Sequence, residues 1–497
     1  MPGYVAVDLG AESGRVLAGR YDGERLAVRE IHRFANHPRR TADDLTWDLD
    51  RLHEETVRGL GMAAAQVGDV RSVGVDGWGS DFGLLDGEDR LLSPPWHHRT
   101  PRTAAMVREL RKAVEPQVLY DVTGTQFLPI TTACQLLAMR ETGILERADR
   151  LSMLPDLVAG RLSGVHRTER TIASTTQLWD IRHGRWATEV IDLLGLPRHL
   201  FRDEVVHAGT PLGPLRTDMR AQPGGARQIS VVAVAGHDTA CAIAAVPGRG
   251  EGVGFVSCGT WSLVGVETPT PITTPHARAA GFTNELGVGG GIRFLSNVNG
   301  LWLLQESRRV WAGGGNPLSY AELTALAARS APYRSLIDPD HPSLLSPGDV
   351  PRRIATLCRA TGQPVPDGPG EVARCVLDSL ACKYRWVLER ASAVSGQPLR
   401  TVHVVGGGAA NEVLCQLTAD LTGLPVVAGP VEATALGNLL VQIMADGGLS
   451  GLAEARALVR SSVPLRRHEP GGETAEAEAC YDRFRKVMAR LAPEHAA

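Results

Sequence analysis

The chain repeats one strand plan twice, and this repetition limits its fold more than any other feature. Residues 4–31, YVAVDLGAESGRVLAGRYDGERLAVREI, are typical of three strands joined by a tight turn at Gly10–Gly14 and a second turn at Asp22–Gly23. Residues 252–267, GVGFVSCGTWSLVGVE, begin the same plan again, with small residues at Cys258–Thr260 between two apolar strands. Two meanders so far apart predict an internally duplicated chain.

Length and patterning favour two α/β domains. The 497 residues exceed one ordinary domain, and 43% apolar residues are enough to build more than one core. Segments of helical periodicity alternate with strand-like segments, and residues 100–200 are mostly helical in pattern. We expect an N-terminal domain over 1–244, a C-terminal domain over 245–460 and a helical extension over 461–497.

Charge excludes several classes of partner. Lys and Arg total 52 against 55 Asp and Glu, so the net charge of −3 leaves no basic surplus for contacts along a nucleic acid. The N-terminus has no cationic start before a long apolar segment, and no stretch reaches the ~18 apolar residues of a spanning helix. We therefore expect a cytoplasmic protein that binds neither nucleic acid nor membrane.

The eight cysteines are scattered and include no CxxC pair, so the sequence predicts neither a zinc site nor a disulfide framework. Most are expected to be small core residues. Whether Cys358 and Cys375 pair is left open.

Glycine-rich turns after strands indicate phosphate binding, because backbone N–H groups at small residues can approach phosphate oxygens. A dinucleotide fingerprint would lead directly into a helix, but DLGAESG at 8–14 leads into a strand-like segment and GGGAAN at 406–411 lacks the third glycine. A P-loop needs a lysine after its glycines, and the three lysines, 112, 383 and 486, follow no glycine loop. The remaining interpretation is a phosphate site formed by two hairpin turns, one from each half of the chain.

These turns carry a family resemblance that spans nearly the whole chain. The segments DLGAESGR, GHDTA, SCGTWSL, VVGGGAANEV and EATALGN resemble the phosphate, catalytic and adenosine motifs of the FGGY carbohydrate kinases. The resemblance implies an α/β fold of two ribonuclease-H-like domains, as in the actin and hexokinase superfamily, around a central cleft. It also implies ATP and Mg²⁺ as cofactors, a small sugar as partner, and a monomer or homodimer.

Longer stretches resemble the bacterial family members that phosphorylate L-rhamnulose: residues 46–52, 74–86, 155–180 and 281–307. The implied reaction transfers the γ-phosphate of ATP to the C1 hydroxyl of L-rhamnulose in L-rhamnose catabolism. Two alternatives stay open: a kinase for another ketose, such as L-fuculose or L-xylulose, and a sensor that binds sugar or nucleotide without turnover.

The resemblance also implies residue roles. Asp238 would be the catalytic base, although on the residues alone it could equally cap a helix. Asp8 would hold Mg²⁺, with an Asx turn as its structural alternative. The expected ATP contacts are Ala11, Glu12, Ser13, Gly14, Arg15, Thr260, Gln305, Gly406, Gly407 and Gly408. The expected sugar contacts are Gly79, Trp78, Asp81, His237, Asp238 and Asn297, although a Trp is more often a core residue.

One segment departs from the family pattern on the sugar side. Where a Tyr-Arg-Asp run is expected before the Arg-Thr pair, the chain reads His98-Arg99-Thr100-Pro101-Arg102-Thr103. A carboxylate is missing from this run, and the TTAC sequence at 131–134 is also atypical. Neither change touches the phosphate motifs, so the departure concerns the choice of sugar rather than the reaction class.

Overall fold

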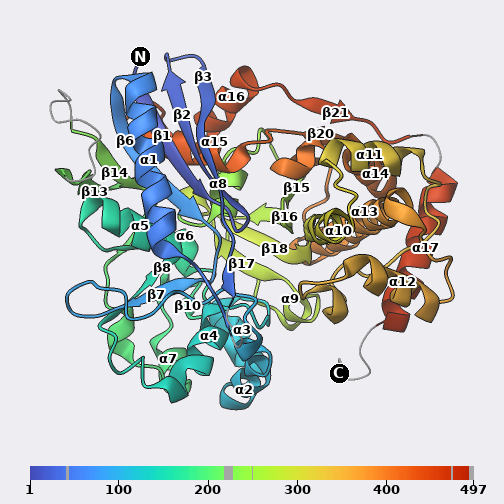
Figure 1. Ribbon diagram of the computed structural model, residues 1–497, viewed down its shortest axis with the longest axis horizontal. Coiled ribbons are helices and arrows are strands. Elements are labelled where there is room, and N and C mark those ends of the chain that lie inside the picture. The colour runs from blue at the N-terminus through green and yellow to red at the C-terminus, as the bar shows by residue number, and fades with distance from the viewer. Residues whose placement is uncertain (41–43, 218–227, 249, 472–473, 492–497) are drawn as a thin grey trace. The chain divides into compact units, whose positions relative to one another are not determined.

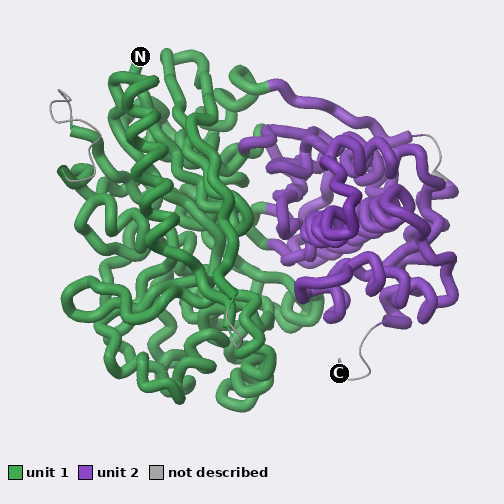
Figure 2. The backbone as a smooth tube through the Cα atoms, in the orientation of Figure 1, with its two compact units in different colours: residues 1–247, 267–294, 433–463 green, residues 248–266, 295–432, 464–497 purple. Residues whose placement is uncertain are grey.

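The computed structural model describes residues 1–40, 44–217, 228–248, 250–471 and 474–491, which form two compact units (Figure 2). Unit 1 contains residues 1–247, 267–294 and 433–463, and unit 2 contains residues 248–266, 295–432 and 464–497. Within the described residues, no helix has the length and apolar character that crossing a membrane requires.

Unit 1 is built on a six-stranded sheet in the order β13-β14-β6-β1-β2-β3 (Figure 1). Its strands are β1 (Gly3–Leu9), β2 (Ser13–Tyr21), β3 (Leu26–Ala35), β6 (Val70–Gly77), β13 (Thr210–Pro214) and β14 (Ser230–Ala233). The first three strands pair antiparallel in succession, and β6 pairs parallel with both β1 and β14. The predicted N-terminal meander is confirmed.

Helices cover both faces of this sheet. In α1 (Leu49–Val67), Leu49, Leu52, Leu60 and Ala63 are buried at helical spacing. A Cβ added at Gly59 of α1 would lie 2.4 Å from the Val16 side chain, whereas one at Gly19 would lie 2.8 Å from Leu439 of α15 (Ala433–Ala445). Because strand residues an odd number apart point to opposite faces, α1 and α15 lie on opposite sides of β2.

The remaining elements of unit 1 pack on this sheet or form small two-stranded sheets and helices beside it. They are β4 (Arg39–Arg40), β5 (Leu45–Thr46), β7 (Phe82–Leu85), β8 (Arg150–Met153), β9 (Thr168–Glu169), β10 (Trp179–Asp180), β11 (Arg185–Trp186), β12 (Val205–Val206), β17 (Thr283–Leu286), α2 (Met106–Ala113), α3 (Pro116–Thr123), α4 (Thr132–Met139), α5 (Leu154–Ser163), α6 (Arg170–Ala173), α7 (Thr188–Leu193), α8 (Asp238–Ala244), α9 (Pro275–Ala279) and α16 (Leu452–Ser462). The largely helical pattern expected for 100–200 is confirmed.

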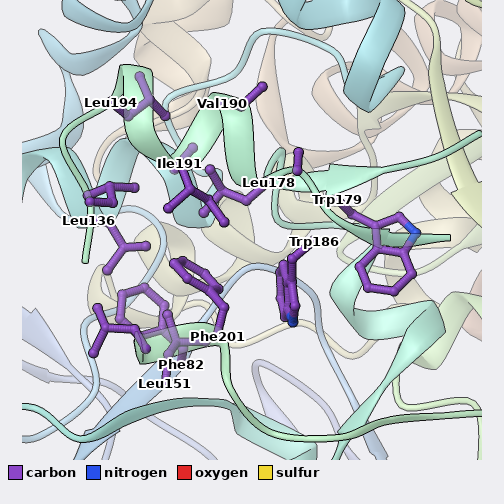
Figure 3. Close-up of a cluster of buried hydrophobic side chains, with 14 of the residues drawn as sticks. Phe82, Leu136, Leu151, Leu178, Trp179, Trp186, Val190, Ile191, Leu194 and Phe201 are labelled. Atoms are coloured by element: carbon purple, nitrogen blue, oxygen red, sulfur yellow. The ribbon is translucent and has the colours of Figure 1, made fainter. Parts of the chain in front are cut away.

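A second core lies among these smaller elements. Figure 3 shows Trp186 between Trp179 and Phe201, with Phe82 and Leu151 nearby. The rings of Trp179 and Trp186 meet edge to face, with centroids 5.5 Å apart. Large aromatic side chains therefore fix the helical region that the sequence places after β7.

Unit 2 repeats the plan of unit 1. The sheet that contains its strands has the order β17-β18-β16-β15-β19-β20-β21, of which β17 is counted in unit 1, and β15 pairs antiparallel with β16 and parallel with β19. Its elements are β15 (Val253–Cys258), β16 (Trp261–Thr268), β18 (Ile292–Asn299), β19 (Thr401–Val405), β20 (Val426–Ala428), β21 (Arg466–His468), α10 (Trp302–Gly313), α11 (Tyr320–Arg329), α12 (Val350–Ala360), α13 (Gly368–Ser395), α14 (Glu412–Thr422) and α17 (Thr474–Leu491), with the last residues of β16 and the first of β18 counted in unit 1.

The two sheets share one topology. The order β3-β2-β1-β6-β14 in unit 1 and the order β18-β16-β15-β19-β20 in unit 2 both place the first strand in the centre, between the second and the fourth. Each sheet also joins an antiparallel meander to parallel strands. The predicted second meander and the two-domain α/β fold are confirmed. Residues 472–473 and 492–497 of the expected helical extension lie outside the described residues.

Candidate active site

Two aspartates are register partners on neighbouring strands of the unit 1 sheet. Asp8 on β1 pairs with Asp76 on β6, and both strands run parallel and end one residue later. β14 runs parallel to β6, and the bridge between Gly77 and His237 continues this pairing to the residue before Asp238. Because parallel strands end at the same edge, Asp8, Asp76 and Asp238 lie within range of one another's charge.

Asp238 is the first residue of α8, with His237 at the N-cap position, so it is not the cap residue. Its Oδ1 accepts from the backbone N–H of Thr239 at 2.5 Å and from Thr239 Oγ1 at 3.1 Å, and it lies 3.4 Å from His237 Nε2. No other described residue donates to Asp238, so Oδ2 is unengaged within that part of the chain. The side chain is 30% exposed. One carboxylate oxygen is thus fixed, and the other is available to a ligand.

Burial raises the pKa of Asp238, His237 opposes this shift and the negative charge of Asp8 adds to it. A raised pKa brings the carboxylate nearer to the strength that a general base needs close to neutral pH.

Asp8 is held by the loop that follows it. The Arg15 guanidinium pairs with the Asp8 carboxylate, and the two residues face each other across the β1–β2 register. Ala11 and Glu12 form the turn, and Ser13 begins β2. A Cβ at Gly14 would lie 2.1 Å from the Phe34 ring, so this glycine is required by packing. The residues of the predicted first phosphate loop therefore lie together around Asp8.

Asp76 is a site residue that the sequence analysis did not single out. Its side chain is fully buried, Oδ2 accepts from Asn438 Nδ2 at 2.6 Å, and Oδ1 has no hydrogen-bond partner among the described residues. Gln442 continues the network, donating to Asn438 Oδ1 at 2.6 Å and accepting from Ser72 Oγ at 2.7 Å. A signal was present in the sequence, because VGVDG at 73–77 repeats the pattern of VAVDLG at 5–10.

Replacing Asp76 with Asn should stabilise the protein at pH 7–8. Burial and the charge of Asp8 raise the pKa of Asp76 well above its usual value, so the folded state binds a proton that the unfolded state has lost. Wild-type stability therefore falls as pH rises from about 4 to the pKa of the folded state, by up to about 1.4 kcal/mol per pH unit in that range. We expect urea unfolding to show a gain for Asp76→Asn at pH 8 that vanishes near pH 4. A loss at pH 8 would contradict this account.

The loop that carries Asp238 is fixed by a buried glutamate. Glu169 Oε2 accepts from the backbone N–H groups of Gly236 at 2.9 Å, Thr171 at 2.8 Å and Ile172 at 3.2 Å. The N–H of His237 lies 3.4 Å from Thr171 Oγ1. Glu169 thereby ties the start of α6 to the residue two positions before the proposed base.

The expected sugar residue Asp81 is the centre of a buried cluster. Its Oδ2 accepts from Trp47 Nε1 and Trp78 Nε1, both at 2.7 Å, and lies 3.0 Å from His98 Nδ1. Its Oδ1 accepts from Gln135 Nε2 at 3.0 Å. Asp81 is fully buried and Trp78 is 6% exposed. The structure therefore shows Asp81 holding the indole rings rather than presenting a free acceptor.

The departure at 98–103 is matched by a carboxylate from elsewhere in the chain. Thr100 Oγ1 donates to Asp44 Oδ1 at 3.1 Å, and Arg102 Nε lies 3.0 Å from Asp44 Oδ2. In the atypical TTAC segment, Thr131 caps α4 and Thr132 Oγ1 donates to the Ser80 carbonyl at 2.7 Å. Asp44 thus places a negative charge beside a run that has no carboxylate of its own.

Unit 2 brings together most of the residues expected on the nucleotide side. Gln305 Nε2 donates to Thr260 Oγ1 at 3.3 Å, and Gln305 Oε1 is buried without a hydrogen-bond partner among the described residues. Gly406 has φ 81°, and a Cβ at Gly408 would lie 2.1 Å from Cys258 Sγ. The backbone after β19 therefore approaches the β15–β16 turn closely because two of its residues lack side chains. Gly407 has open space around it, and Asn297 lies on β18.

Comparison with known proteins identifies the family. Residues 3–245 match the N-terminal domain, and residues 254–445 the C-terminal domain, of the FGGY family of carbohydrate kinases. The chain belongs to this family. It is 40% identical to the rhamnulokinase of Bacteroides thetaiotaomicron over 98% of this chain and 99% of that protein. It is 38% identical to the rhamnulokinase of Enterococcus faecalis over 97% of each chain, and 35% identical to that of Bacillus subtilis over 94% of this chain and 95% of that protein.

Solved structures show the same fold at low identity. The FGGY kinase chain aligns with the gluconate kinase of Lactobacillus acidophilus at TM-score 0.80 and 14% identity over 99% of each chain. It aligns with the ligand-bound xylulose kinase of the same organism at TM-score 0.79 and 14% identity, over 100% of this chain and 99% of that one. The carbohydrate kinase class predicted from the motifs is confirmed.

The donor atoms of this FGGY kinase fit a hard divalent cation. Asp8 and the unpartnered Oδ1 of Asp76 are carboxylate oxygens from adjacent strand ends. Among the residues described, no cluster of three or more His, Cys, Asp or Glu side chains is placed to hold a metal ion. Mg²⁺ typically keeps several waters and takes one or two carboxylates together with phosphate oxygens, so a small donor set is what it needs.

Proposed function

We propose that this FGGY kinase uses ATP to phosphorylate L-rhamnulose at its C1 hydroxyl, giving L-rhamnulose 1-phosphate. The observation that carries the proposal is the near-full-length similarity, at 35 to 40% identity, to proteins named rhamnulokinases. The alternatives are a kinase for another ketose, such as L-fuculose or L-xylulose, and a sensor without turnover.

We assign the role of general base to Asp238, with Oδ2 as the oxygen that accepts the proton. The C1 oxygen attacks the γ-phosphorus, the bond from that phosphorus to the bridging oxygen breaks, and ADP leaves with the electron pair. The hydroxyl proton passes to Oδ2, since Oδ1 is engaged by Thr239 and faces His237. A carboxylate cannot deprotonate a free alcohol in advance, so the transfer comes late, as the O–P bond forms in a loose transition state.

The phosphate side is assigned to the loop around Asp8. Backbone N–H groups of residues 11–14 and the Arg15 guanidinium would stabilise the charge that develops on the transferred group. Asp8, with Asp76 beside it, would hold Mg²⁺, which neutralises phosphate charge when bound. In unit 2, the proposed nucleotide contacts are Thr260, Gln305 and the glycines 406–408.

The sugar side is assigned to Gly79, Trp78, His237 and Asn297, with Asp81 supporting Trp78 from behind. In domain terms, residues 1–244 would bind the sugar and phosphates, 245–460 the nucleotide, and 461–497 would be an extension. We also propose a monomer or homodimer that acts in the cytoplasm, an environment in which the eight free thiols of the structure are stable.

A ketose panel tests the proposed substrate. ADP release by the purified protein with MgATP should give the highest kcat/KM with L-rhamnulose, ahead of L-fuculose, L-xylulose and D-fructose. If another ketose gave the highest kcat/KM, the kinase assignment would stand and the assigned substrate would change. Tight sugar binding without ADP release from any ketose would instead favour the sensor.

A further inference from the structure

A buried ion pair lies behind the loop that carries Asp238. Arg293 Nη1 on β18 and Glu285 Oε2 on β17 are 3.0 Å apart, and their side chains are 0% and 7% exposed. Arg293 Nε and Nη2 also donate to the Leu286 carbonyl at 3.2 and 3.1 Å. Such a pair adds little net stability, because removing two charges from water offsets their attraction. What the pair touches is therefore the better guide to its role.

The pair touches His237 at one ring nitrogen. Arg293 Nη2 is 3.1 Å from His237 Nδ1 with the geometry of a hydrogen bond, and Glu285 Oε2 is 3.2 Å from the same atom. A guanidinium can only donate, so Nδ1 must accept, and the proton of a neutral imidazole then resides on Nε2. Nε2 is the nitrogen that lies 3.4 Å from Asp238 Oδ1.

Other charged groups surround this arrangement without touching Nδ1. They are Glu169 on β9, Asp8 on β1, Asp76 on β6 and Arg15 on β2. The Glu285 carboxylate stays ionised in this setting: burial alone would raise its pKa, but the positive charge of Arg293 opposes this and the pKa is lowered. Within the described residues, Arg293 and Glu285 are the charged groups that meet the Nδ1 edge of the ring.

We propose that Arg293, with Glu285 as its counter-ion, is a positioning residue that keeps the His237 proton on Nε2. The ring then donates toward Asp238 Oδ1 and leaves Oδ2 for the sugar hydroxyl. This inference rests on the proposed role of Asp238. Without Arg293, no donor holds Nδ1 as an acceptor, so Nδ1 can carry the proton, and the lone pair of Nε2 then faces the Asp238 carboxylate. That repulsion favours protonated Asp238 and disturbs its orientation.

The test replaces both members of the pair, so that no buried charge is left unpaired. We expect Glu285→Leu/Arg293→Met to fold, to keep the KM for ATP, and to lose about tenfold or more in kcat, a part of what a general base supplies. The acid limb of its kcat/KM profile should move to higher pH. A matched control is Arg374→Met/Asp378→Leu on α13, a pair 2.8 Å apart with side chains 12% and 1% exposed, for which we expect wild-type kcat and pH profile.

A second readout is independent of turnover. In spectra of ¹⁵N-histidine-labelled protein, the His237 signals are those lost in His237→Gln. We expect the Nε2–H tautomer in the wild type and a loss of that preference in the double variant. Because this result needs no ketose, it tests the proton position even if the ketose panel fails.

Two results would overturn the proposal. One is a double variant with wild-type kcat, acid limb and tautomer, which would leave the pair a purely structural role. The other comes from Arg293→Lys, which is the variant to measure if the double variant does not fold. This change keeps the positive charge opposite Glu285, but a single ammonium cannot replace the planar guanidinium that contacts both Leu286 and His237. Lower kcat in Arg293→Lys at unchanged KM for ATP supports the proposal, and wild-type kcat overturns it.

Discussion

Replacing Asp238 with Asn should lower kcat about 10²- to 10⁴-fold, the usual contribution of a general base, while ATP still binds. The amide oxygen can occupy the Oδ1 position and accept from the N–H of Thr239, so the loop keeps its shape. The amide nitrogen then stands where Oδ2 was and presents a donor to the sugar hydroxyl. The measurement is the initial rate of ADP release with both substrates saturating, together with the KM for ATP.

The matched control is Asp192→Asn, the same chemical change at a carboxylate that is 43% exposed and paired with Arg198 on the surface. It should leave kcat at the wild-type value. If Asp238→Asn kept most of the wild-type kcat, the proton would have to leave the hydroxyl by another route, and Asp238 would be reduced to binding.

The pH profile gives the same prediction a second signature. The base must be ionised to accept a proton, so kcat/KM should fall as pH falls through the pKa of Asp238. Burial and Asp8 raise that pKa, and the acid limb should therefore lie above the ~3.9 of an unperturbed aspartate. The residual rate of Asp238→Asn should lack this limb.

The strand plan could be predicted from the sequence because its signals are local. Alternating apolar residues and small-residue turns specify hairpins within about 30 residues, as the β1–β3 meander shows. Asp8 and Asp238 could be singled out for the same reason, since Asp8 follows an apolar run directly and Asp238 follows one after two further residues. The residues that support them are not local. Gly236 reaches Glu169 across 67 positions, and Arg293 reaches His237 across 56.

On the sugar side, the partners of a motif side chain come from distant parts of the sequence. The run at 98–103 lacks a carboxylate, but Asp44 supplies one from 56 positions before Thr100. Asp81 was expected to contact the sugar because of the family resemblance. Its hydrogen-bond donors include Trp47 and Gln135, which lie 34 and 54 positions away, and no local sequence pattern predicts these contacts. Whether a carboxylate binds a ligand or supports other side chains depends on contacts that form only in the folded protein.

Replacing Asp81 with Ala should be the most destabilising single change on the sugar side. It removes the acceptor of two indole N–H groups, a Gln135 amide and the His98 backbone N–H, all of them buried. Each buried donor left without a partner costs ~1–3 kcal/mol, so we expect the free energy of unfolding to fall by at least about 3–5 kcal/mol. Urea unfolding followed by tryptophan fluorescence measures this directly, because Trp47 and Trp78 both contact Asp81.

The pH dependence and a control separate a support from a sugar ligand. Burial would raise the pKa of Asp81, but the charge and hydrogen bond of His98 outweigh it and the pKa is lowered. Its stabilisation is then present above ~4 and is lost as pH falls through the lower folded value, so the difference between wild type and Asp81→Ala should shrink as pH is lowered below about 4. Asp50→Ala, at a carboxylate 81% exposed, should change stability little. Wild-type stability of Asp81→Ala with a raised KM for the ketose alone would mean that Asp81 binds the sugar after all.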